Sequence, residues 1–165
     1  MKTFFITTLV FLLHFQTITA QTATQNFDAL KQAINKINPE VDFTDKLVFI
    51  STWKSTDFES RETNKEAYRV YKIYERAKLK NGEKGTVFIS LNLDTDNQIR
   101  TISIGKDGLD ASVVYSNNEL IKLIDKAFSV ANPQNTIVFD KTGTVQYTNI
   151  PKDQIFPSLR NLITR

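Results

Sequence analysis

Two near-continuous apolar runs, separated by a helical stretch, constrain the fold of this chain more than any other feature. The runs are KLVFIST at residues 46–52 and TVFISLNL at residues 86–93. Runs of this kind are typical of strands that are buried on both faces of a parallel sheet. Residues 57–80 between them have apolar side chains at helical spacing, which predicts a right-handed crossover between parallel strands. We therefore predict an α/β fold with helices on both faces of the sheet.

The start of the helical stretch matches a capping box. Thr56 stands at the expected N-cap, and Glu59 follows three residues later. We count Phe58 as the first member of the apolar stripe of this helix. The pair Asn81–Gly82 is expected to end it. The sequence therefore predicts one long helix over residues 57–80.

The remaining elements alternate between helix and strand and end in a hairpin. Helices are predicted at residues 28–37, 97–104, 118–128 and 151–163, and extended segments at residues 112–115, 135–139 and 144–147. The turn residues 140–143, with sequence Asp-Lys-Thr-Gly, join the last two strands, so the hairpin adds an antiparallel edge. Pro157 indicates a kink or a late start of the closing helix.

The first twenty residues have the pattern of a secretory signal peptide. Lys2 supplies a positive charge, residues 4–15 are apolar, and Ala20 closes a stretch suited to cleavage. This apolar run is shorter than the roughly 20 residues of a relaxed membrane span. We therefore expect export to the periplasm or the extracellular space, with membrane attachment only through an uncleaved signal. The expected organisation is a signal peptide at residues 1–20, an N-terminal extension with a short helix at 21–40, and one domain at 41–165.

Reactive side chains are scarce outside the predicted signal. The chain has no Cys, and both its single His and its single Met, His14 and Met1, lie in the signal. Disulfide exchange needs a thiolate, Ser-His catalysis needs an imidazole, and most zinc, copper and haem sites need His or Cys. We therefore expect neither disulfide oxidoreductase nor peroxidase activity, no cofactor and no metal. The 21 basic and 18 acidic residues are interspersed, which argues against nucleic acid as a partner.

Four segments in order resemble the thioredoxin-like fold family, and within it the exported TlpA/ResA-like group related to peroxiredoxins. The segments are KLVFISTW, TVFISLNLD, NQIRTISIGKDGL and PQNTIVFDKTGTV. The resemblance covers roughly residues 41–163. It implies a three-layer sandwich whose central mixed sheet has four to five strands and helices on both faces.

The family carries Trp-Cys-x-x-Cys where this chain has Trp53, Lys54, Ser55, Thr56 and Asp57. By position, Lys54 replaces the first cysteine and Asp57 replaces the second. The resemblance therefore implies the loop without its chemistry. It leaves two interpretations of Trp53, as a residue that lines a peptide-binding groove or as packing over the end of the sheet. Lys54 and Asp57 are expected either to contact a ligand or to pair with each other.

The segment that corresponds to the cis-proline loop of the family contains Pro133, Gln134 and Asn135. The family usually has proline six residues before the Asp of its Asp-x-x-Gly turn, which here is Asp140. Counting back six residues gives Gln134 instead. We expect either a loop shifted by one residue or loss of the cis-proline, in which case Gln134 retains the substrate-facing backbone position.

Acidic residues after the second apolar run offer oxygen ligands. Asp94, Asp96 and Asp107 could hold a hard cation. The segment lacks the Gly and the distal Glu of an EF-hand, so a strand-end turn is the favoured interpretation.

Three functions are compatible with these observations. The first is a non-catalytic binding or interaction module of the cell envelope, whose partner is an extended polypeptide or an envelope protein. The second is an enzyme of the same fold with changed chemistry, such as glutathione-transferase-like use of Ser55. The third is a purely structural envelope protein. The scarcity of His and Cys disfavours the enzyme, and an exposed apolar patch near Trp53 would favour the binding module.

Overall fold

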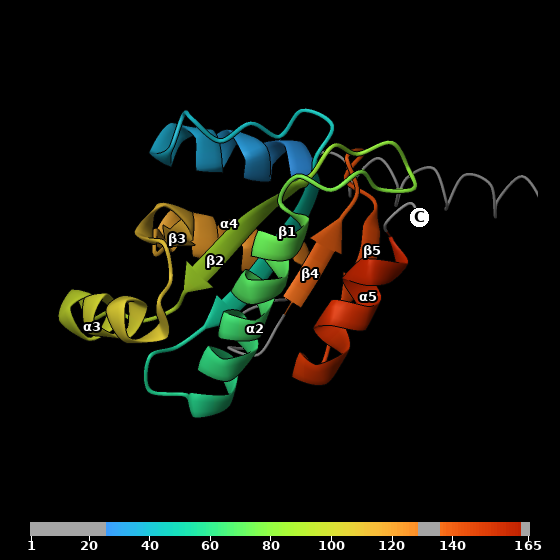
Figure 1. The fold of residues 1–165 in the computed structure, drawn as a ribbon. Helices are drawn as coiled ribbons and strands as arrows, with labels where there is room; N and C mark the ends of the chain where they lie inside the picture. The colour runs from blue at the N-terminus through green and yellow to red at the C-terminus, as the bar shows by residue number, and fades with distance from the viewer. Residues whose placement is uncertain (1–25, 129–135, 163–165) are drawn as a thin grey trace, which may run out of the picture.

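The computed structural model describes residues 26–128 and 136–162 (Figure 1). The predicted signal peptide and residues 133–135 lie outside the described part. The elements are a helix at 26–37, β1 (Leu47–Trp53), α2 (Phe58–Tyr74), β2 (Thr86–Asn92), α3 (Asn97–Asp107), η1 (Ala111–Val113), β3 (Val114–Tyr115), α4 (Asn118–Phe128), β4 (Thr136–Phe139), β5 (Val145–Thr148), η2 (Lys152–Gln154) and α5 (Ile155–Asn161). Within these residues, no helix has the length and apolar character that crossing a membrane requires.

The five strands form one mixed sheet in the order β3-β2-β1-β4-β5. β1 pairs in parallel with β2 over its whole length, and all seven residues of β1 are buried. β3 is parallel to β2, whereas β4 is antiparallel to β1 and β5 is antiparallel to β4. The predicted buried parallel pair and the predicted antiparallel hairpin edge are therefore confirmed.

Helices cover both faces of this sheet. In Figure 1, α2 and α5 lie on the side that faces the viewer, and α4 lies behind the sheet. The side chains of β1 alternate accordingly. Val48 and Ile50 pack with the helix at 26–37 and with α4, whereas Leu47 and Phe49 pack with α2 and α5. The expected three layers are present.

The helix at 26–37, which the sequence indicated as part of an extension, belongs to the core of the domain. Phe27, Leu30 and Ile34 are buried in one cluster with the sheet. The backbone of Gly143 in the β4–β5 turn approaches Phe27 so closely that a Cβ atom at this position would lie 2.6 Å from the ring. Gly143 also has a φ of 85°, which favours glycine. The hairpin and the N-terminal helix are therefore fitted to each other.

The prediction that the long helix reaches residue 80 and ends at Asn81–Gly82 is wrong. α2 ends at Tyr74, and the carbonyl of Glu75 accepts the N–H of Thr86 at 3.1 Å. Residues 78–84 form a tight reversal closed by a bridge between Lys78 and Lys84. The helix ends early because this hydrogen bond brings the start of β2 back to the end of α2.

Three other elements differ from their predicted bounds. α3 continues to Asp107, and Gly108 ends it in the left-handed conformation with a φ of 64°. The predicted extended segment at 112–115 is a 3₁₀ turn followed by a strand of two residues, β3. α5 begins at Ile155, which places Pro157 in its first turn, where a missing backbone N–H is tolerated. The late start of the closing helix is therefore confirmed.

Candidate functional site

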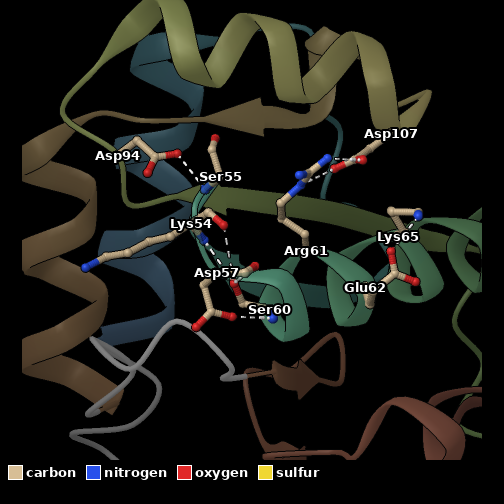
Figure 2. Close-up of polar contacts among 9 residues, drawn as sticks. All are labelled: Lys54, Ser55, Asp57, Ser60, Arg61, Glu62, Lys65, Asp94 and Asp107. Atoms are coloured by element: carbon tan, nitrogen blue, oxygen red, sulfur yellow. Dashed lines mark hydrogen bonds and ion pairs between the residues drawn. The ribbon is translucent and has the colours of Figure 1, made fainter.

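The loop of residues 54–57 connects the carboxyl end of β1 to the amino end of α2 (Figure 2). Asp57 is the N-cap of α2, because its carboxylate accepts the N–H of Ser60 at 2.7 Å. The buried hydroxyl of Ser60 in turn accepts the N–H of Lys54 at 3.1 Å. The prediction that Thr56 caps the helix is wrong by one residue. The side chain of Ser60 makes the reciprocal contact with the loop.

The backbone of this loop closes a turn between the two positions that carry cysteine in the family. The N–H of Asp57 donates to the carbonyl of Lys54 at 3.1 Å, and in such a turn the first and fourth α-carbons lie less than about 7 Å apart. The two side chains diverge in Figure 2, and that of Lys54 is exposed. Asp57 is engaged by Ser60, so the interpretation in which Lys54 and Asp57 pair with each other does not fit.

Trp53 lies beneath the loop and not on its surface. Its exposed fraction is 0%, and its indole N–H donates to the hydroxyl of Ser90 at 2.8 Å. The same hydroxyl donates to the side-chain carbonyl of Asn64 on α2 at 3.0 Å. Of the two interpretations of Trp53, the structure supports packing over the end of the sheet.

Polar side chains continue this layer across three neighbouring strands. Ser51 on β1 has Ser90 and Thr136 as its register partners on either side. The hydroxyl of Thr136 accepts the N–H of Ile150 at 2.7 Å. The hydroxyl of Ser51 and the side-chain nitrogen of Asn64 have no hydrogen-bond partner. The layer beneath the loop is therefore polar and buried, and only some of its polar groups have hydrogen-bond partners.

Ser55 is held from the side of β2. Its backbone N–H donates to the carboxylate of Asp94 at 2.8 Å, and the side-chain amide of Asn92 donates to the same oxygen at 2.8 Å. Burial raises the pKa of Asp94, but the hydrogen bonds from Ser55 and Asn92 and the positive charge of Lys54 outweigh it and leave that pKa lowered. The Ser55 hydroxyl is buried without a hydrogen-bond partner. A substrate cannot reach this hydroxyl in the structure, which disfavours its use as a catalytic group.

The three aspartates considered as cation ligands have separate roles. Asp94 holds the loop, and Asp96 is the N-cap of α3, where it accepts the N–H groups of Gln98 and Ile99. Asp107 accepts two hydrogen bonds from the guanidinium of Arg61, at 3.0 and 2.5 Å, and so joins α3 to α2 (Figure 2). Across residues 26–128 and 136–162, no group of three or more acidic or His side chains could hold a metal ion.

Phe58 is the surface residue that the sequence interpretation missed. We placed it in the apolar stripe of α2, but its exposed fraction is 74%. The buried face of α2 contains Ser60, Asn64, Ala67 and Tyr71. Phe58 precedes Ser60 by two residues, which is about 200° around a helix. The sequence concealed this register because two of the inward positions are polar.

The second loop that the resemblance implied, at Pro133, Gln134 and Asn135, lies outside the described residues. The shifted loop and the loss of the cis-proline that the sequence indicated there therefore remain predictions. The site that the structure does describe consists of the exposed residues Lys54, Thr56 and Phe58, the capping residue Asp57 between them, and the buried layer beneath.

The chain was compared with family models, curated proteins and solved structures, and only solved structures are similar to it. No family model matches the chain, and no curated protein matches it. Among solved structures, a thiol:disulfide interchange protein from Bacteroides sp. has a TM-score of 0.61 and 15% identity, covering 74% of this chain and 76% of that one. The thioredoxin domain of a thiol-disulfide oxidoreductase from Bacteroides vulgatus has a TM-score of 0.59 and 15% identity, covering 74% and 83%.

A third similar structure is a secreted disulfide oxidoreductase from Mycobacterium tuberculosis, with a TM-score of 0.55 and 11% identity over 73% of this chain and 84% of that one. These similarities show that the chain has the thioredoxin-like fold. The predicted fold class and the predicted resemblance to the thioredoxin-like fold are thereby confirmed. The chain contains no cysteine, which is consistent with a fold member that lacks the CxxC motif.

Proposed function

We propose that this protein is an exported, redox-inactive thioredoxin-like protein that acts as a non-catalytic binding module in the cell envelope. The observation that carries the proposal is the loop of residues 54–57, which keeps a capped, hydrogen-bonded connection from β1 to α2 although the chain has no sulfur for it to activate. Binding to a surface needs such a fixed geometry but no nucleophile.

The binding surface of the proposal is formed by Lys54, Thr56, Asp57 and Phe58, and its partner is an extended polypeptide. Lys54 in the loop and Phe58 in the first turn of α2 are both exposed. Aromatic residues are enriched at protein interfaces, where they bury large areas. Trp53 and Ser55 support this surface from below, since both are buried.

An affinity experiment tests the binding surface. The chain without residues 1–20 is immobilised and exposed to envelope extract, and a Phe58→Ser variant is compared with Ile73→Ser. Ile73 is the matched control, because it also lies on α2 and is 50% exposed. We expect a protein that the native chain and Ile73→Ser capture equally and that Phe58→Ser loses. Equal capture by both variants, or none by the native chain, would overturn the proposed surface.

The export part of the proposal rests on the signal-like N-terminus and on a secreted disulfide oxidoreductase among the similar structures. Its test is the intact mass of the protein recovered from the producing cells. We expect a chain cleaved near Ala20, whereas a mature protein that begins at Met1 would contradict export. Insulin reduction by the purified chain should not exceed the uncatalysed rate, because the chain offers no thiolate.

A further inference from the structure

A basic surface lies at the end of the sheet opposite the loop of residues 54–57 (Figure 1). The reversal at 78–84 leads into β2, which is parallel to β1, and the β4–β5 turn follows β4, which is antiparallel to β1. Both connections therefore lie where β1 begins, whereas the loop follows the residue where β1 ends. The basic end, as we name this surface, consists of Lys46, Lys78, Lys80, Lys84 and Lys141.

Contacts between three segments hold these lysines near one another. The ammonium group of Lys46 donates a hydrogen bond to the carbonyl of Lys84 at 2.8 Å. A Cβ atom at Gly82 would lie 3.3 Å from the ammonium nitrogen of Lys141, so the reversal and the β4–β5 turn are in contact. Lys78 and Lys84 pair across the reversal, which puts their side chains on the same face. The five lysines therefore share one surface.

The position of Lys78 opposite Lys84 is unfavourable for the fold by itself. Like charges directly opposite each other across a strand pair are destabilising. Asp45 lies 3.6 Å from Lys84 and offsets part of this repulsion. Glu83 is the acidic residue of the reversal, but it is only 2% exposed and does not reach the outer surface. An anionic surface that approaches from outside would reduce the repulsion that remains.

Carboxylates at the margin of the basic end are engaged by the chain itself. Asp140 is buried and accepts backbone N–H groups within its own turn at 2.9 and 3.0 Å. Asp42 and Asp45 line a cavity together with Lys141, and Asp42 accepts the N–H of Thr44 at 2.8 Å. The five lysines therefore outnumber the two carboxylates that border them at the surface.

The domain is joined to its N-terminal segment at this same end. Phe27 lies next to the first described residue and packs against Gly143 in the β4–β5 turn, two residues after Lys141. Residues 4–15, the apolar run of the predicted signal, therefore connect to the domain beside the basic end. A membrane that holds this run during export lies nearer to the basic end than to the loop of residues 54–57.

We propose that the basic end docks onto a membrane surface that carries anionic phospholipid headgroups. The lysines attract the headgroup phosphates, and the charge of the two surfaces is complementary. Docking directs the loop of residues 54–57 away from the membrane, toward its polypeptide partner. It adds to the sequence expectation, under which membrane contact needed an uncleaved signal. The location at a membrane rests on the proposed export, whereas lipid binding by the purified chain does not, so the two can fail separately.

Co-sedimentation with vesicles tests the docking. The chain without residues 1–20, which contains every described residue, is mixed with vesicles of phosphatidylglycerol and phosphatidylcholine in equal parts, or of phosphatidylcholine alone. We expect binding only to the anionic vesicles. Raising NaCl from about 0.05 M to about 0.5 M should lower the partition coefficient by about tenfold or more, because salt screens exposed charges. No binding to the anionic vesicles, or equal binding to both kinds, would overturn the proposal.

Charge reversal locates the surface. Lys80→Glu with Lys141→Glu should lower the partition coefficient by about tenfold or more, since each lysine near an anionic surface contributes about fivefold. Lys106→Glu with Lys122→Glu is the matched control, because it makes the same change in net charge at exposed positions of α3 and α4. The control should lower the coefficient by less than about threefold, because these charges lie far from the docked surface.

Equal losses in the two double variants would mean that net charge, and not the basic end, drives binding, and would overturn the proposal. Circular dichroism checks that each variant is folded. If charge reversal unfolds the chain, Lys80→Gln with Lys141→Gln replaces it, and a partition coefficient equal to that of the native chain would then overturn the proposal.

Discussion

The two faces of the central sheet are built differently at the carboxyl end of β1. On the face of the N-terminal helix and α4, Val48 and Ile50 belong to an apolar cluster, and Thr52 follows them as a single buried polar residue of β1 on this face. On the face of α2, Leu47 and Phe49 give way to Ser51, in a layer of hydroxyl and amide groups. A fully buried Leu or Ile contributes about 1.5–3 kcal/mol, whereas a buried hydrogen bond contributes about 0.5–1.5 kcal/mol net.

Apolar packing and the hydrogen-bonded layer therefore have different roles, since the first stabilises the fold and the second positions the loop of residues 54–57. The apolar clusters on the two faces supply most of the free energy that holds the sheet and its helices together. The polar layer on the face of α2 contributes less energy per residue but fixes directions, because Trp53, Ser90 and Asn64 are linked by hydrogen bonds under the loop. We infer that the loop of residues 54–57 has a fixed geometry because hydrogen bonds hold the side chains beneath it in place.

The largest effect is expected in the apolar cluster that contains the N-terminal helix. Leu30→Ala should lower the free energy of unfolding by about 2–5 kcal/mol, because Leu30 is fully buried in this cluster. Ile37→Ala in the same helix is the control and should lower it by less than about 1 kcal/mol, since Ile37 is 45% exposed. Denaturant unfolding measures both. Similar values for the two variants would mean that the helix is not part of the core.

A smaller loss is expected in the polar layer. Ser90→Ala removes one hydroxyl that makes two hydrogen bonds, to Trp53 and Asn64. It should lower the free energy of unfolding by about 1–3 kcal/mol, because two buried polar groups lose their partner. Ser51→Ala should be neutral or stabilising, since the Ser51 hydroxyl is buried without a partner. If the two variants lose equal stability, the hydrogen-bonded layer is not what distinguishes them.

The helix cap should have an effect of about 1 kcal/mol. Asp57→Ala removes the acceptor of the Ser60 N–H and should lower the free energy of unfolding by about 0.5–2 kcal/mol. Thr56→Ala should be close to neutral, because Thr56 is exposed and is not the cap. Thermal and denaturant unfolding of both variants compare them. A larger loss of stability in Thr56→Ala than in Asp57→Ala would mean that Thr56 is the cap.

The smallest expected effect depends on pH. The pKa of Asp94 is lowered in the folded chain, so its ionised form stabilises the fold at pH values above the ordinary carboxyl pKa of about 4. This contribution is lost as the pH falls through the lowered pKa. Native protein should therefore be more stable than Asp94→Asn at pH 7, and the difference should shrink toward zero in acid. If the stability difference between the two proteins grew in acid, ionised Asp94 would not stabilise the folded chain.

The sequence predicted the sheet well because its signals are local and strong. β1 and β2 are continuous apolar runs. The turn before β5 ends in Gly143, whose positive φ favours glycine, so its sequence is typical of a turn. The end of α2 was missed because it depends on a hydrogen bond between Glu75 and Thr86, which are eleven residues apart. No periodicity within the helix contains that information.

The candidate site was less predictable than the fold. The position of the loop followed from the order of the elements, but the exposure of each residue followed from the register of α2. That register is set by Ser60 and Asn64, which are buried because they have hydrogen-bond partners. A search for apolar periodicity treats both as surface residues, and it therefore placed Phe58 inside.

The central claim is that the loop of residues 54–57 has the geometry of a thioredoxin-type loop without its sulfur. The double substitution Lys54→Cys, Asp57→Cys tests it in a chain with no other cysteine. A disulfide needs α-carbons about 4.4–6.8 Å apart, and the hydrogen bond from Asp57 to the Lys54 carbonyl closes a turn of that size. Loss of the cap should lower the free energy of unfolding by about 1 kcal/mol and leave the chain folded.

Free thiols are counted after mild oxidation of the purified double variant. We predict no free thiol in a folded monomer, and a lowered pKa for the thiol at position 54 in the reduced form, because both positions lie at the amino end of α2. Two free thiols in a folded, monomeric variant would contradict the account at its centre.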